Sequence, residues 1–86
     1  MSQTQKKKRP SLPKPEAKID LHGFTVEVAY QQCRSKLQAY YDREYAVVEI
    51  ITGKSGQIRA EFPFWMENFG YKAQVLPGNG SFLVYL

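Results

Sequence analysis

The chain has 86 residues, a formal net charge of +4 and a single cysteine, Cys33. This length allows one small domain, and the lone cysteine excludes an internal disulfide and a cysteine-based metal site. No apolar run approaches the roughly 20 residues of a membrane span and none follows the basic N-terminus as in a secretory signal, so we expect no membrane contact. The single cysteine suits a reducing compartment, and we expect a cytoplasmic protein that is a monomer.

Residues 1–17 are predicted to form a flexible basic arm. The segment is rich in lysine, glutamine, serine and proline and has no apolar periodicity. Six of the first 18 residues are basic and one is acidic, so the remainder of the chain is close to neutral. Three interpretations of the arm stay open: a solubilising tail, an arm that binds phosphates of nucleic acid, and a nuclear-import signal in "KKKRP".

A short strand and a long helix are predicted next. "KIDLHG" (18–23) alternates polar and apolar residues, which indicates a strand that ends at His22 or Gly23. Thr25 is a suitable helix N-cap, and the helix dipole favours the negative charge of Glu27 in the first turn. An apolar stripe of four or five turns follows, in which Cys33 is a small core residue: Val26, Ala29, Tyr30, Cys33, Leu37 and Tyr40 or Tyr41.

The second half of the chain predicts a strand, a helix and two strands. "YAVVEII" (45–51) has the composition of a strand buried on nearly both faces, and 52–57 is a loop. An apolar stripe over 58–69 indicates a second helix that ends at Gly70, with Pro63 expected in its first turns. Residues 71–76 and 81–86 are predicted strands that pair as a hairpin across "PGNG".

The predicted fold is therefore an α/β two-layer sandwich with the element order β-α-β-α-β-β. Its four-stranded mixed sheet is mostly parallel with an antiparallel final strand, and two helices cover at least one face. Strand, helix and strand in succession imply a parallel crossover. Ligands of such sheets bind outside the carboxyl ends of the parallel strands, where "DLHG" and "TGKSG" both emerge.

Asp20 and the only histidine, His22, are the candidate catalytic pair. On a strand their side chains share a face, with α-carbons roughly 6.6 Å apart. The carboxylate could orient the imidazole for proton transfer in phosphodiester cleavage. The alternative, a structural pair in which Asp20 caps nearby backbone, stays open at this point.

The loop "TGKSG" (52–56) is a candidate phosphate site. Its glycines let backbone N–H groups approach an oxyanion ahead of a helix N-terminus, and Lys54 and Arg59 add positive charge. The spacing is not that of a P-loop, and the glycines could serve only the turn. No carboxylate cluster demands a metal; no cofactor is required, although a divalent ion such as Mg²⁺ is not excluded.

Three aromatic residues could stack on nucleic-acid bases. They are Phe24, Tyr71 and Tyr85. We favour core packing for all three.

The segments "IDLHGFTVEVAYQQCRSKL", "VVEIITGKSGQIRAEFPFWM" and "LPGNGSFLVYL" together resemble the Smr (small MutS-related) domain over about residues 18–86. The resemblance implies a fold similar to the C-terminal domain of translation initiation factor three. It also implies binding of RNA or DNA, and cleavage by an endonuclease in many members, including cleavage of mRNA on stalled ribosomes. The positions that match the family's motifs are Asp20, His22, Gly23, Thr52, Gly53, Lys54, Ser55, Gly56, Arg59, Gly78 and Gly80.

Two departures from the family pattern leave the function open. Ser55 stands where glycine is frequent, and Thr52 replaces a histidine found in many members. His22 therefore has no second histidine for a two-histidine mechanism. The leading hypothesis is an endonuclease on RNA or DNA. The alternative is a non-catalytic module that binds nucleic acid or the ribosome, and a third possibility is a protein–protein adaptor.

Overall fold

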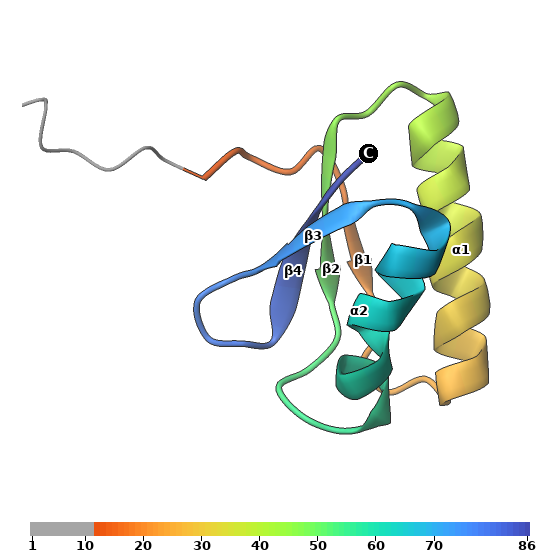
Figure 1. Ribbon diagram of the computed structural model, residues 1–86, viewed down its shortest axis with the longest axis vertical. Helices are drawn as coiled ribbons and strands as arrows, with labels where there is room; N and C mark the ends of the chain where they lie inside the picture. The colour runs from red at the N-terminus through yellow and green to blue at the C-terminus, as the bar shows by residue number, and fades with distance from the viewer. Residues whose placement is uncertain (1–11) are drawn as a thin grey trace, which may run out of the picture.

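The computed structural model describes residues 12–86, which form four strands and two helices in the predicted order (Figure 1). The elements are β1 (Lys18–Asp20), α1 (Val26–Asp42), β2 (Val47–Ile51), α2 (Gln57–Phe69), β3 (Lys72–Val75) and β4 (Ser81–Tyr85). In this part of the chain no helix is both long and apolar enough to cross a membrane.

The four strands form one mixed sheet in the order β1-β2-β4-β3. β1 pairs in parallel with β2, whereas β4 runs antiparallel to both β2 and β3. β4 is thus the only one of the four that runs in the opposite direction, and the predicted β3–β4 hairpin is confirmed. The insertion of β4 between β2 and β3 was not predicted.

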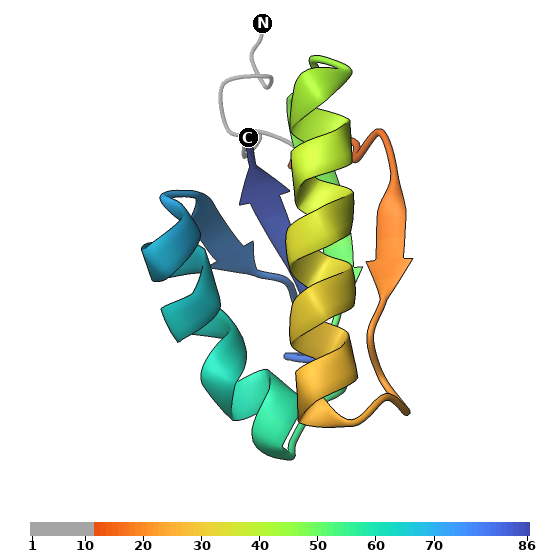
Figure 2. The same ribbon diagram turned by 90° about the vertical axis from the view of Figure 1, so that its right-hand side faces the viewer.

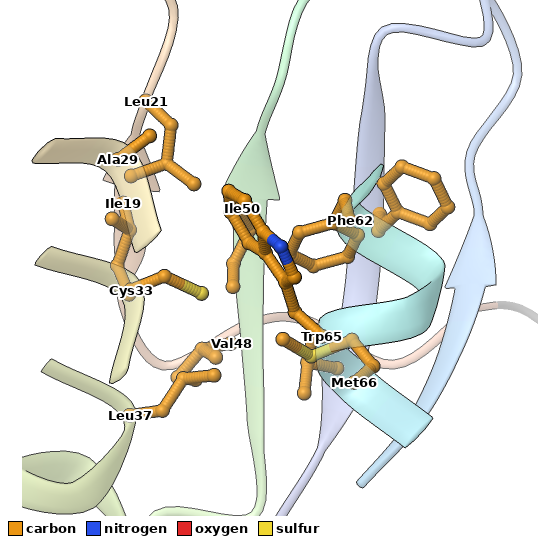
Figure 3. Packing of buried hydrophobic residues seen from close by; sticks show 12 residues of the cluster. Ile19, Leu21, Ala29, Cys33, Leu37, Val48, Ile50, Phe62, Trp65 and Met66 are labelled. Atoms are coloured by element: carbon orange, nitrogen blue, oxygen red, sulfur yellow. The ribbon is translucent and has the colours of Figure 1, made fainter. Parts of the chain in front are cut away.

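Both helices lie on one face of the sheet, which gives the predicted two layers (Figures 1 and 2). Apolar side chains of both helices and of β1, β2 and β4 meet in one core (Figure 3). Its members are Ile19, Leu21, Ala29, Cys33, Leu37, Val48, Ile50, Phe62, Trp65, Met66, Phe82 and Val84. Burial raises the pKa of the Cys33 thiol to about 12, so this cysteine is an unreactive core residue, as predicted.

The helix ends follow local chemistry, with one correction. Thr25 caps α1, because its Oγ1 accepts a hydrogen bond from Val28 N at 3.2 Å, and Gly70 ends α2 in the left-handed conformation with φ 86°. The placement of Pro63 in the first turns was wrong: it is the seventh residue of α2, where a proline removes an internal hydrogen bond. Burial of Phe62 on the core face stabilises the helix despite this loss.

β1 is shorter than predicted, because it ends at Asp20 rather than at His22 or Gly23. The last ladder bond joins Leu21 N to Ile51 O at 2.8 Å, and the Asp20 carboxylate then accepts the N–H of His22 at 3.1 Å. The side chain of Asp20 thus turns the chain away from the sheet.

The two residues that precede β1, Glu16 and Ala17, also form hydrogen bonds with the sheet. Glu16 Oε1 accepts the N–H groups of Ala46 and Val47 at 2.5 and 3.0 Å, and Ala17 O accepts Glu49 N at 2.9 Å. Residues 16 and 17, which were predicted to belong to the arm, therefore extend the pairing of β1. The rest of the arm prediction falls largely on residues 1–11, outside the described residues.

Candidate functional site

The two loops that follow β1 and β2 meet where both helices begin, at the lower end of Figures 1 and 2. In the first loop, Phe24 N donates to Leu21 O at 3.3 Å, which closes a turn that Gly23 passes with φ 89°. This turn presents the ring of His22 to solvent, with 69% of its side chain exposed. The imidazole is therefore free to meet a ligand from outside.

Asp20 holds the imidazole from one side. Its Oδ1 lies 2.7 Å from His22 Nδ1 and also accepts the backbone N–H of His22. Because a carboxylate only accepts, Nδ1 carries a proton, and in the neutral ring Nε2 is then the free base. The pair is thus arranged for proton transfer through Nε2.

The hydrogen bond from the His22 ring holds the pKa of Asp20 below its ordinary value. Asp20 is therefore ionised at neutral pH and stays so into the acid range. The carboxylate contributes stability above about pH 4, where unfolded aspartate is ionised, and this contribution is lost as pH falls through the lower folded pKa.

An open hollow of about 680 Å³ lies between the two loops, within the usual size range of ligand pockets. Its lining residues are His22, Gly23, Phe24, Thr25, Val26, Thr52, Gly53, Lys54, Ser55, Gly56, Gln57 and Ile58. The N-termini of both helices therefore border it. Gly56 caps α2 without a side-chain hydrogen bond, so the first N–H groups of α2 are left for an external acceptor. With Lys54, they favour an anion in this hollow.

A second, smaller and more open hollow adjoins the first, and His22, Gly53 and Lys54 line both. It adds residues of β2, β4 and the turn between β3 and β4: Ile51, Pro77, Gly78, Gly80 and Ser81. The carbonyl of Gly80 accepts the N–H groups of Thr52 and Gly53, each at 3.0 Å. The turn after β3 thus holds the loop after β2 in place.

Gly80 allows the turn after β3 to approach Lys54 closely, whereas Gly53 is favoured by its backbone conformation. A side-chain carbon on Gly80 would lie 3.2 Å from Lys54 Cγ, and one on Gly53 would lie 3.9 Å from the Cβ of His22. Gly53 has φ 87°, which strains other residues.

Arg59 lies apart from both hollows and is bonded to the turn after β3. Its Nε donates to Asn79 O at 3.1 Å and its Nη2 to Asn79 Oδ1 at 2.6 Å. The guanidinium also stacks over the Phe82 ring at 4.6 Å from the centroid. Through Asn79 and Gly80, this arginine supports the loop that carries Lys54.

The model of the Smr domain family matches residues 19–86. The chain belongs to the Smr domain family. The resemblance inferred from the sequence is thereby confirmed, and membership indicates a nucleic-acid-binding or nuclease-type function. Neither curated proteins nor solved structures matched the chain, so its likeness to translation initiation factor three stays a prediction.

In this Smr domain the fold brings together ten of the eleven site residues predicted from the sequence. The glycines, Thr52, Lys54 and Ser55 line one or both hollows, and Asp20 contacts His22. Arg59 is the exception. Within residues 12–86 no group of three or more histidine, cysteine, aspartate or glutamate side chains could hold a metal ion.

Sequence reasoning favoured the wrong interpretation for one residue of the site and missed another. Phe24 was predicted to pack in the core, yet it is 44% exposed and lines the first hollow. Its position directly after His22 and Gly23 was the available signal. Asn79, which binds Arg59 across 20 residues of sequence, had no local signal. Of the other two aromatic candidates, Tyr71 packs against the core and Tyr85 donates to Gln74 at 2.6 Å.

Replacing Arg59 with alanine or lysine tests its role in this Smr domain. Either change removes the paired contact with Asn79, and we expect the free energy of unfolding to fall by about 1–2 kcal/mol in urea titrations. A residue that contacts phosphate would instead lower the salt slope of nucleic-acid binding by about one and tolerate lysine. The exposed Arg34 on α1, replaced by alanine, is the control.

Proposed function

We propose that this Smr domain is an endonuclease that cleaves phosphodiester bonds in RNA or nicks DNA. The observation that carries the proposal is the 2.7 Å contact between Asp20 and His22 beside the hollow that Lys54 lines. A base oriented by a carboxylate thereby adjoins a site that favours anions. Nucleic acid, as the family indicates, supplies both the anion and the bond to be cut.

His22 is proposed to act as the general base. Its Nε2 takes the proton of the attacking oxygen, which belongs to the neighbouring 2′-hydroxyl in RNA or to water in DNA. The attacking oxygen forms a bond to phosphorus while the bond from phosphorus to the leaving oxygen breaks. The leaving oxygen takes a proton from the imidazolium or from solvent. Asp20 positions the ring and stabilises its charged form.

Lys54 and the N–H groups of the loop after β2 are proposed to bind the phosphate. Negative charge grows on the phosphate oxygens as the bonds exchange, and donors fixed in advance stabilise that charge. The hydrogen bonds from Thr52 and Gly53 to Gly80 support this fixed geometry. The basic residues at 6–9, outside the described residues, are proposed to add unspecific affinity that falls steeply with salt.

The proposal is tested by incubating the protein with labelled structured RNA and with supercoiled DNA, each with Mg²⁺ or with EDTA. A variant that combines Asp20→Asn with His22→Ala serves as the matched preparation without the proposed base. We expect discrete fragments or nicked circles from the parent protein only. The two metal conditions determine whether Mg²⁺ contributes.

Equal cleavage by the parent and the double variant would contradict the proposal. Intact nucleic acid in a stable complex with the parent would instead support the non-catalytic binding module. Repeating the assay on stalled ribosomes would then separate a pure binder from an enzyme that requires the ribosome.

A further inference from the structure

Phe24 is an apolar ring at a polar site. It is 44% exposed and lies outside the core cluster. The backbone fixes its position on both sides, because Phe24 N donates to Leu21 O and the following Thr25 caps α1. An exposed aromatic side chain held in this way is a candidate contact for a ligand.

The location of Phe24 distinguishes it from the other large hydrophobic residues exposed in residues 12–86. Leu12, Val28, Tyr41, Phe64 and Val75 are exposed to a similar or greater degree, but none of them lines either hollow at the site. Phe24 alone combines exposure with a place in the hollow that holds Lys54 and borders His22.

Phe24 lines the same hollow as the proposed phosphate-binding loop. Phe24 is two positions after His22, so the two α-carbons are at most about 7 Å apart. The opposite side of the hollow is the loop of Gly53, Lys54 and Ser55, which offers N–H groups and charge to a phosphate. A nucleotide whose phosphate contacts that loop therefore has its base near the ring.

We propose that Phe24 is a stacking platform for the nucleobase next to the cleaved phosphodiester bond. This inference rests on the proposed function and specifies its substrate class: a strand that is unpaired at the site. A base within a duplex has both faces covered by its neighbours, whereas an unpaired base can place one face on the ring. Since every base has such a face, the contact adds affinity without base preference.

The test compares a short single-stranded oligonucleotide with the same strand lacking all its bases. Binding is measured by fluorescence anisotropy in a His22→Ala background, so that the strand stays intact. We expect the protein to bind the strand with bases about 5- to 100-fold more tightly than the baseless strand. Phe24→Ala is expected to abolish most of this preference, and Phe24→Trp to retain it.

Phe64→Ala is the matched control, because Phe64 is 64% exposed on α2 but lies outside both hollows. The inference is overturned if Phe24→Ala keeps the full preference for the strand with bases, or if the protein with Phe24 shows no such preference. The proposed function fails separately, when the parent protein leaves every substrate uncut; a stacking preference could still be measured in that case.

Discussion

Replacing His22 with alanine is expected to lower the rate of phosphodiester cleavage by about 10²- to 10⁴-fold, the usual contribution of a general base. The side chain is 69% exposed, so its removal leaves the core intact. The affinity for nucleic acid should change little, because Lys54 and the loop N–H groups remain. Single-turnover rates at saturating protein, with dissociation constants measured in parallel, separate the two effects.

Asp20→Asn is expected to lower the same rate through His22. An asparagine can offer its N–H₂ group to Nδ1, which places the ring proton on Nε2 and removes the free base. The two residues then act as a unit, so the double variant should be no slower than His22→Ala alone. Asp42→Asn, which alters an exposed aspartate at the far end of α1, is the control.

Two results would contradict this account of the pair. Multiplicative losses in the double variant would mean that Asp20 acts independently of the histidine. A parental rate in His22→Ala would remove the imidazole from the chemistry altogether. In both cases circular dichroism establishes that the variants are folded.

Phe62→Ala is expected to cost about 3–5 kcal/mol of folding free energy, as large-to-small changes at fully buried aromatic positions do. Its ring lies 4.6 Å from that of Phe82 and 6.3 Å from that of Trp65, between centroids. A domain of this size has a total stability of about 4–13 kcal/mol. Because Pro63 already removes a hydrogen bond within α2, the helix depends on this packing.

Urea titration measures the loss directly, and the lone cysteine provides a second signal. Cys33 is buried and its pKa is raised to about 12, so it should resist alkylation near pH 8 in the parent protein. In the Phe62→Ala variant the thiol should react faster, because the weakened core unfolds more often. Phe64→Ala, two positions along α2 but 64% exposed, should change stability by less than about 0.5 kcal/mol. Equal stability of Phe62→Ala and Phe64→Ala would contradict the described core.

Much of the fold was predictable because its signals are local. The apolar stripe of α1 repeats at spacings of three and four, Thr25 has the oxygen that a helix N-cap needs, and Gly70 adopts a backbone conformation that favours glycine. The site was predictable to a similar extent, because the loops with His22 and Lys54 both follow strands that end at the same edge.

The order of the elements, the caps Thr25 and Gly70 and the two glycine-containing loops were predictable from the sequence alone, since each depends on neighbouring residues. The position of β4 between β2 and β3 was not, because pairs such as Val48 and Val84 are far apart in sequence and carry no local sign of their register. The bond between Arg59 and Asn79 likewise joins segments that are 20 residues apart. The end of β1 and the exposure of Phe24 instead follow from short-range bonds, from His22 N to Asp20 and from Phe24 N to Leu21 O, which outcompeted the alternating pattern of the strand.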